Sequence, residues 1–123
     1  MKISKLGVIV TSAVLFVPVA AHAGCTIYED RDFRGASYYL ANKTELVMTR
    51  APALGVSRSH GPTTYHEPSW NDQVSSFKVS AGCTITLYQH ANETGSIFRT
   101  SKSYSYIGSG WNDQASYASC SCR

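Results

Sequence analysis

The tetrapeptide Trp-Asn-Asp-Gln occurs twice in this chain of 123 residues, and the duplication constrains the fold more than any other feature. The two occurrences read WNDQVSSF at 70–77 and WNDQASYA at 111–118, so they are 41 residues apart. That separation is too long for two turns of one element and fits two copies of a supersecondary unit. The sequence therefore predicts an internal repeat.

The first 23 residues differ in character from the rest of the chain. Lys2 and Lys5 precede an apolar stretch at 6–20, and Ala-His-Ala follows at 21–23. This arrangement is typical of a secretory signal peptide that is cleaved before Gly24. The apolar stretch is shorter than the about 20 residues that span a membrane. We therefore expect a signal peptide at 1–23 and a secreted or periplasmic protein without membrane insertion.

An alternative interpretation of the leader is a lipoprotein signal, in which Cys25 would carry the lipid. His22 stands where such signals have an aliphatic residue, so cleavage before residue 24 is preferred. The mature chain would then be one domain at 24–123, which is long enough for a modest core. Without the two leader lysines it has 9 Lys+Arg against 8 Asp+Glu, so the net charge falls from +3 to +1. This charge balance gives no basis for a nucleic-acid partner. We expect the protein to be a monomer.

The mature sequence predicts antiparallel β-structure. Short alternating stretches are separated by Gly, Asn and Asp, and apolar residues at helical spacing are scarce. The predicted strands are 25–28, 36–40, 75–79, 84–88 and 96–100. A short helical turn is expected only at 44–50. This pattern indicates a β-sandwich or β-barrel.

The repeat divides the mature chain into a first copy at about 25–80 and a second copy at about 83–123, with about four strands each. Two such units packed face to face would cover their apolar faces. The first copy is longer because of 41–69, which contains three prolines and two glycines and is predicted to be an extended loop.

The four cysteines, Cys25, Cys83, Cys120 and Cys122, all lie in the mature part. An even number in an exported domain predicts two disulfides, with three possible pairings. Zinc binding is the competing interpretation, but the chain has no C-x-x-C pair to support it.

The segment YEDRDFRG at 28–35 resembles the Y-x-x-x-x-[FY]-x-G hairpin signature of βγ-crystallins. Gly35 can take positive φ where the hairpin folds back, and Tyr28 and Phe33 can stack across it. In that family a loop of the form [ND]-[ND]-x-x-[ST]-S follows, and NDQVSS at 71–76 satisfies every position.

The second copy matches the same two signatures less completely. YQHANETG at 88–95 has Glu93 in place of the second aromatic, and NDQASY at 112–117 has Tyr117 in place of the last serine. The order of hairpin, loop, hairpin and loop nevertheless extends over essentially the whole mature chain. The chain is therefore similar to a secreted, single-domain microbial βγ-crystallin. The resemblance implies an all-β fold in which two Greek-key motifs form one eight-stranded sandwich.

The resemblance also implies calcium binding by the two loops. Ca²⁺ prefers six to eight oxygen ligands, and one loop alone has too few charged groups to hold it. For the first site the family pattern implies the carbonyl of Gln73 and the hydroxyl of Ser75, with Asp113 contributed by the second loop. Glu29, which follows the hairpin tyrosine, adds a carbonyl oxygen. The amide oxygen of Asn71 is a further candidate ligand.

The second site is implied in the same way. Gln114 and Ser116 would bind the ion together with Asp72 from the first loop, and Gln89 is a further candidate. The amide oxygen of Asn112 is a candidate ligand that the pattern assigns to neither site in particular. We expect two calcium ions with Kd values of roughly 10⁻⁵ to 10⁻³ M, which mainly stabilise the fold. The alternative is a structural role alone, since Asn, Asp and Ser are common in turns.

The same resemblance implies a disulfide pattern, because the first and last strands of a crystallin Greek key are antiparallel neighbours. Cys83 should then bond to Cys120 or Cys122, and Cys25 to the other of these two. A bond between residues 120 and 122 would close a very tight ring and is disfavoured.

Two further classes of function are conceivable for this chain. An enzyme is not expected, because His60, His66 and His90 fit no catalytic or metal-ligand spacing and no nucleophile motif is apparent. A secreted peptidase inhibitor or toxin is the stronger alternative. It would use the long segment at 41–69 to contact a secreted protease or another extracellular protein.

Overall fold

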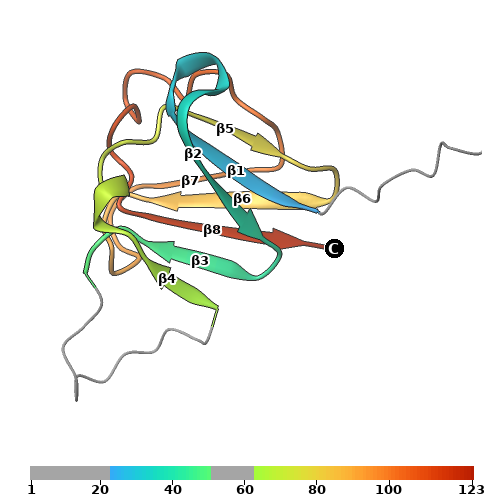
Figure 1. Ribbon diagram of the computed structural model, residues 1–123, viewed down its shortest axis with the longest axis horizontal. Coiled ribbons are helices and arrows are strands. Elements are labelled where there is room, and N and C mark those ends of the chain that lie inside the picture. Colours follow the sequence, from blue (N-terminus) through green and yellow to red (C-terminus); the bar gives the residue numbers. More distant parts are fainter. Residues whose placement is uncertain (1–22, 51–62) are drawn as a thin grey trace, which may run out of the picture.

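The computed structural model describes residues 23–50 and 63–123, which form two β-sheets packed face to face (Figure 1). The smaller sheet has the strand order β2-β1-β5, with β1 at Gly24–Asp30, β2 at Arg34–Ala41 and β5 at Ser76–Val79. The larger sheet has the order β4-β3-β8-β6-β7, with β3 at Thr44–Val47, β4 at Thr64–His66, β6 at Cys83–Tyr88, β7 at Ile97–Thr100 and β8 at Tyr117–Cys122. Two short 3₁₀ turns, Arg31–Phe33 and Pro68–Trp70, complete the described elements.

The fold is all-β with eight strands, as predicted, and each of the five predicted stretches overlaps a strand. These stretches are rich in Thr, Ile, Tyr and Phe, which favour extended backbone and pack well on a pleated surface. The predicted leader at 1–23 lies outside the described residues except for Ala23. Within the described ranges, no helix is long and apolar enough to cross a membrane.

The two sequence copies are interlocked, because strands of the first copy extend the sheet of the second. The first and last strands of each copy are antiparallel neighbours, β1 with β5 and β6 with β8, as the family resemblance implies. However, β3 of the first copy pairs with β8 of the second copy, where Leu46 lies opposite Ala118. In return, Tyr104 of the second copy forms an isolated bridge with Phe77 on β5. Two separate four-stranded units were expected, but the smaller sheet consists of three first-copy strands, and the larger sheet combines β3 and β4 of the first copy with the three strands of the second.

Two expectations for the first copy are wrong. Residues 44–47 form strand β3 and not a helical turn, because pairing with β8 buries Leu46 and Val47 completely. The segment at 41–69 is not simply an extended loop, since it contains β3 and β4, which pair in parallel with Glu45 opposite Thr64. Residues 51–62 of this segment lie outside the described part of the chain.

The folded hairpin of the first copy has the geometry that its signature predicts. Gly35 has a φ of 79°, and a Cβ added there would lie 2.6 Å from Oδ2 of Asp30. The rings of Tyr28 and Phe33 meet edge to face, with centroids 5.7 Å apart. Ser76 fixes the turn, because its hydroxyl donates to the Asp30 carbonyl at 2.6 Å and accepts from the Phe33 amide at 3.1 Å.

The second copy compensates for its two departures from the signature. Glu93 has the positive φ of this turn, 63°, but supplies no ring to pack on Tyr88. The ring of Tyr117, which replaces the last serine of the loop, packs on Tyr88 instead, with centroids 5.2 Å apart. The missing aromatic of the hairpin is thus supplied by the loop.

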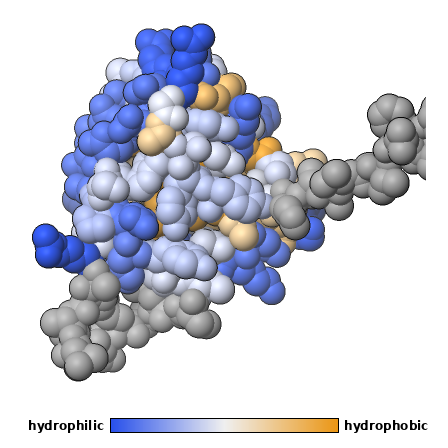
Figure 2. Space-filling model, viewed as in Figure 1, coloured by the Kyte–Doolittle hydropathy of each residue, from blue (hydrophilic) through white to orange (hydrophobic). Residues whose placement is uncertain are grey.

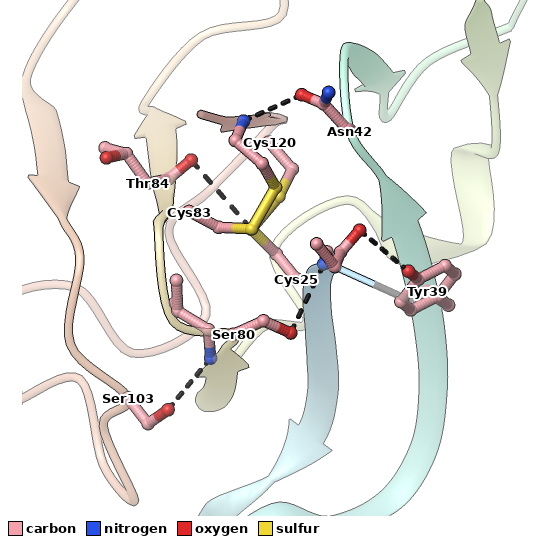
Figure 3. The surroundings of a disulfide bond; sticks show 12 residues. Cys25, Tyr39, Asn42, Ser80, Cys83, Thr84, Ser103 and Cys120 are labelled. Carbon is pink, nitrogen blue, oxygen red and sulfur yellow. Dashed lines mark hydrogen bonds between the residues drawn. A yellow bond between two sulfur atoms is a disulfide. The ribbon is translucent and has the colours of Figure 1, made fainter. Parts of the chain in front are cut away.

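Both disulfides agree with the predicted pattern, and the structure shows which of Cys120 and Cys122 each partner bonds to. Cys83 bonds to Cys122 within the larger sheet, and Cys25 bonds to Cys120 across the two sheets. Figure 3 shows the second of these bonds extending from the start of β1 toward β8, with Ser80 and Tyr39 nearby. A lipid on the sulfur of Cys25 is incompatible with this bond.

One hydrophobic core lies between the sheets and includes the disulfide sulfurs. Its largest fully buried side chains are Phe77, Ile27, Leu40, Leu46, Met48, Ile85 and Leu87. The face seen in Figure 2 is mostly hydrophilic, with small hydrophobic patches. The exposed large hydrophobic residues in the described part, Tyr39, Tyr65 and Ile97, lie on three different edge strands.

Candidate metal site at the paired loops

The two Asn-Asp-Gln loops lie side by side and are joined by reciprocal backbone hydrogen bonds. The amide of Asp72 donates to the Ala115 carbonyl at 3.0 Å, and the amide of Asp113 donates to the Val74 carbonyl at 3.1 Å. Both aspartates have a φ of 58°, in the left-handed region that Asp tolerates better than most residues. Each loop therefore places its aspartate at the border with the other copy.

Each loop is also attached to the hairpin of its own copy. The amide of Ser75 donates to the carbonyl of Tyr28, and the amide of Ser116 donates to the carbonyl of Tyr88, both at 3.0 Å. These bonds bring the residue after each hairpin tyrosine close to the loop, which is the placement that the family pattern requires of Glu29 and Gln89.

Buried residues within the loops hold the polar ones at the surface. Val74 and Ala115 are fully buried, and Trp70 packs edge to face on Tyr38 with centroids 6.4 Å apart. Trp111 packs in the same way on Phe98, at 5.7 Å. The tryptophans therefore act as packing residues, and the Asn, Asp and Gln residues that follow each of them are left near the surface.

The first predicted site coincides with an open cavity of about 680 Å³. The predicted residues in its lining are Glu29, Gln73, Ser75, Asn112 and Asp113. The hydroxyl of Ser75 donates to Oδ1 of Asp113 at 3.4 Å, so the loop serine and the aspartate of the other loop meet as the pattern implies. Asn71 is not part of this lining. Its side-chain amide donates to Oδ2 of Asp72 at 3.2 Å.

Charged residues that the sequence reasoning did not single out also line this cavity. They are Asp30, Asp32, Arg31 and Arg34 from the hairpin. With Glu29 and Asp113, the lining carries four carboxylates against two guanidinium groups, a formal balance of −2. The guanidinium of Arg31 lies over the ring of Tyr106, 4.1 Å from its centroid. The EDRD run in the hairpin was the only available signal for these carboxylates.

The oxygens present fit a hard cation. Oδ1 of Asn112 is buried and has no hydrogen-bond partner among the described residues, while its amide nitrogen donates to Oδ2 of Asp113 at 3.2 Å. A buried acceptor left without a donor costs about 1–3 kcal/mol. A cation in the adjoining cavity would satisfy this oxygen. Carboxylate, carbonyl, amide and hydroxyl oxygens are the ligands that Ca²⁺ prefers.

The second predicted site is less complete. Its cavity has only about 60 Å³ and is lined by Gln89 and Gln114 together with three residues that were not predicted, Ser96, Gly110 and Trp111. These five residues carry no charge, and the lining includes neither Asp72 nor Ser116. The small size of this cavity has in part a local cause, because the side chain of Gln89 accepts a hydrogen bond from the backbone amide of Ser96 at 3.2 Å.

Tyr117, the last residue of the second loop, is engaged with strand β3. Its hydroxyl donates to Oε1 of Glu45. Burial raises the pKa of Tyr117 well above its ordinary value, and the hydrogen bond to Glu45 raises it further. The phenol is therefore a neutral donor at every pH at which the protein would be studied.

Known structures with the same arrangement are βγ-crystallin domains. The chain is similar to such a domain from Flavobacterium johnsoniae, with 25% identity and a TM-score of 0.60 over 80% of this chain and 94% of that one. It is also similar to a double mutant of a βγ-crystallin domain from Clostridium beijerinckii, with 23% identity and a TM-score of 0.59 over 80% and 96% of the two chains. The N-terminal domain of protein S matches with 22% identity and a TM-score of 0.60 over 81% and 97%. The fold is thus of the βγ-crystallin type, as the signatures predict.

The sequence gives a second assignment, at the level of the family. The sequence model of peptidase inhibitor family I36 matches residues 25–100, which is more than half of the chain. The protein therefore belongs to peptidase inhibitor family I36. No curated protein matches the chain in sequence.

Proposed function

We propose that this protein is a secreted, non-catalytic calcium-binding domain in which the ion stabilises the paired loops. The observation that carries the proposal is the first cavity, where Ser75 and Asp113 from different copies meet in a lining with a formal charge of −2. The carbonyls of Glu29 and Gln73 and the amide oxygen of Asn112 would complete the ligand set.

The two sites should differ in affinity. The first cavity has four carboxylates in its lining, whereas the lining of the second is uncharged. Because charge density is a main determinant of calcium affinity, the first site should fill before the second. Asp72 and Ser116 remain the proposed ligands of the weaker site, together with Gln114.

Thermal unfolding with calcium or with chelator tests the proposal. An ion that binds only the folded state stabilises it by RT ln(1 + [L]/Kd). At 1 mM calcium this is about 2.7 kcal/mol for a Kd of about 10⁻⁵ M, and about 0.4 kcal/mol for a Kd of about 10⁻³ M. The larger value would raise Tm by about 10–20 °C in a domain of this size. An Asp113→Asn variant, which keeps the shape of the side chain, should lose most of the increase. A Tm that is the same in 10 mM calcium and in chelator would refute calcium binding.

A second candidate function, inhibition of a secreted peptidase, is favoured by the family match over residues 25–100. We propose that the chain between β3 and β4 contacts the peptidase. Purified protein should be assayed against a panel of secreted peptidases that represents each mechanistic class. Inhibition that is lost when the segment at 51–62 is replaced by a glycine-serine linker would support this role, and no inhibition of any member would count against it.

Secretion belongs to the same proposal. Two disulfides within one hundred residues fit an oxidising compartment outside the cytoplasm, where such bonds form and persist. The proposed partners are calcium and, for the second function, a secreted peptidase. A monomer is expected in both cases.

A further inference from the structure

Strand β4 is the shortest strand of the described fold. It has three residues, lies at the edge of the larger sheet and pairs only with β3 (Figure 1). The central residue, Tyr65, is 50% exposed. Short edge strands with few buried side chains open most easily in native-state exchange. The bonds that hold β4 in place therefore determine how easily this strand opens.

A single carboxylate connects β4 to the second loop. Oε1 of Glu45 on β3 accepts the hydrogen bond from the hydroxyl of Tyr117, and Oε2 accepts one from the hydroxyl of Thr64 on β4 at 3.0 Å. Tyr117 is 1% exposed. Hydrogen bonds to a carboxylate contribute more to stability than hydrogen bonds between neutral groups. We call Tyr117, Glu45 and Thr64 the carboxylate clamp.

The backbone joins the same parts of the molecule. The amide of Met48, which follows β3, donates to the carbonyl of Ser116 at 3.0 Å. On the other side, the amide of Glu67, which follows β4, donates to the carbonyl of Val47 at 3.0 Å. The chain then passes through the 3₁₀ turn Pro68–Trp70 directly into the first loop. The C-terminal ends of both β3 and β4 are thus connected to the paired loops.

The clamp is specific to the second copy. At the equivalent position of the first loop, Ser76 uses its hydroxyl to fix its own hairpin. Tyr117 instead donates its hydroxyl to Glu45 on β3. The departure from the loop signature therefore creates a connection that the first copy lacks.

We propose that the carboxylate clamp transmits calcium binding at the paired loops to strand β4, so that calcium strengthens β4 against local opening. The second loop contributes to both proposed sites, through Asp113 and Ser116, and an ion at either site restrains the loop that carries Tyr117. The inference rests on the proposed calcium binding and extends it to the element that borders the proposed peptidase-contacting segment.

Hydrogen exchange measured residue by residue by NMR tests the proposal. If opening of β4 releases the ion, calcium at ten times Kd slows exchange of the β4 amides and of Glu67 by up to about tenfold. A Tyr117→Phe variant removes only the hydroxyl and should retain calcium binding in a titration while losing most of this slowing. A Tyr104→Phe variant, which removes a hydroxyl from a ring that packs on Phe77, is the matched control and should respond as the wild type does.

The outcomes of this experiment distinguish failure of the clamp proposal from failure of the calcium proposal. Calcium binding without slower exchange of β4 in the wild type would overturn the clamp and leave calcium binding intact. Equal slowing in the wild type and in Tyr117→Phe would also overturn it. An absence of calcium binding would remove both proposals. If Tyr117→Phe fails to fold, Thr64→Val removes the second donor at the half-buried edge of the sheet and must abolish the slowing in the same way.

Discussion

Replacing Ser76 by alanine should destabilise the protein by about 2 kcal/mol and loosen the first cavity. The side chain is fully buried and makes two hydrogen bonds to the hairpin, to the Asp30 carbonyl and from the Phe33 amide. Each such bond contributes about 0.5–1.5 kcal/mol net, and more when the partner is left buried without a substitute. Asp30 is exposed and Phe33 half-buried, so water can partly replace the lost partner, which keeps the estimate near the middle of the range.

The assay is urea unfolding of the oxidised protein, followed by tryptophan fluorescence. With an m-value of about 1–1.5 kcal/mol/M for a domain of this size, the midpoint should fall by about 1–2 M while m stays unchanged. Ser121→Ala is the control, because Ser121 is exposed on β8 and should shift the midpoint by less than the experimental error. Calcium affinity should also fall, since the hairpin carries Glu29 and the two carboxylates that follow it. A change of less than 0.5 kcal/mol relative to the control would show that the hairpin does not depend on this serine.

Two other substitutions test the packing of the fold. Removing the Cys25–Cys120 disulfide, with both residues changed to alanine, should cost about 4–5 kcal/mol because the bond closes a sequence separation of 95 and joins the two sheets. Equal Tm values for this variant and the wild type under oxidising conditions would contradict that role. Tyr117→Ser should cost about 3–5 kcal/mol through loss of a buried ring, and Glu93→Phe in the same chain should restore part of it by returning an aromatic to the hairpin. A double-mutant cycle in urea measures this coupling, and simple additivity would refute the compensation.

The local signatures were readable from sequence because their physics is local. The folded hairpin needs a residue at positive φ, which Gly35 supplies, and two aromatic rings that pack across the fold. These requirements leave a fixed spacing of aromatic residues and glycine in the chain. The disulfide pattern followed from one topological rule, that the first and last strands of a copy are neighbours. The two loops were also recognisable from the sequence, because each contains the same Asn-Asp-Gln segment at the same place in its copy.

The features that the sequence did not predict depend on contacts between distant segments. Strand β3 is extended because its partner is β8, whose paired residues lie 70 to 76 positions further along the chain, and no local pattern at 44–47 specifies that pairing. The contributions of Asp30 and Asp32 to the first cavity appear only when the hairpin is folded over the second loop. The small, uncharged cavity at the second site likewise reflects the side chain of Gln89, whose bond to the Ser96 amide has no sequence signature.

The central claim is that the paired loops bind calcium and that the first site binds it more tightly. The most direct measurement is calorimetric titration of Ca²⁺ into the oxidised mature protein, beside Ser75→Arg and Ser116→Arg variants that place a cation at one site each. The account predicts two binding events in the wild type, loss of the tighter one in Ser75→Arg and loss of the weaker one in Ser116→Arg. No binding heat at several temperatures in a folded wild-type protein, or loss of the tighter event in Ser116→Arg alone, would contradict it.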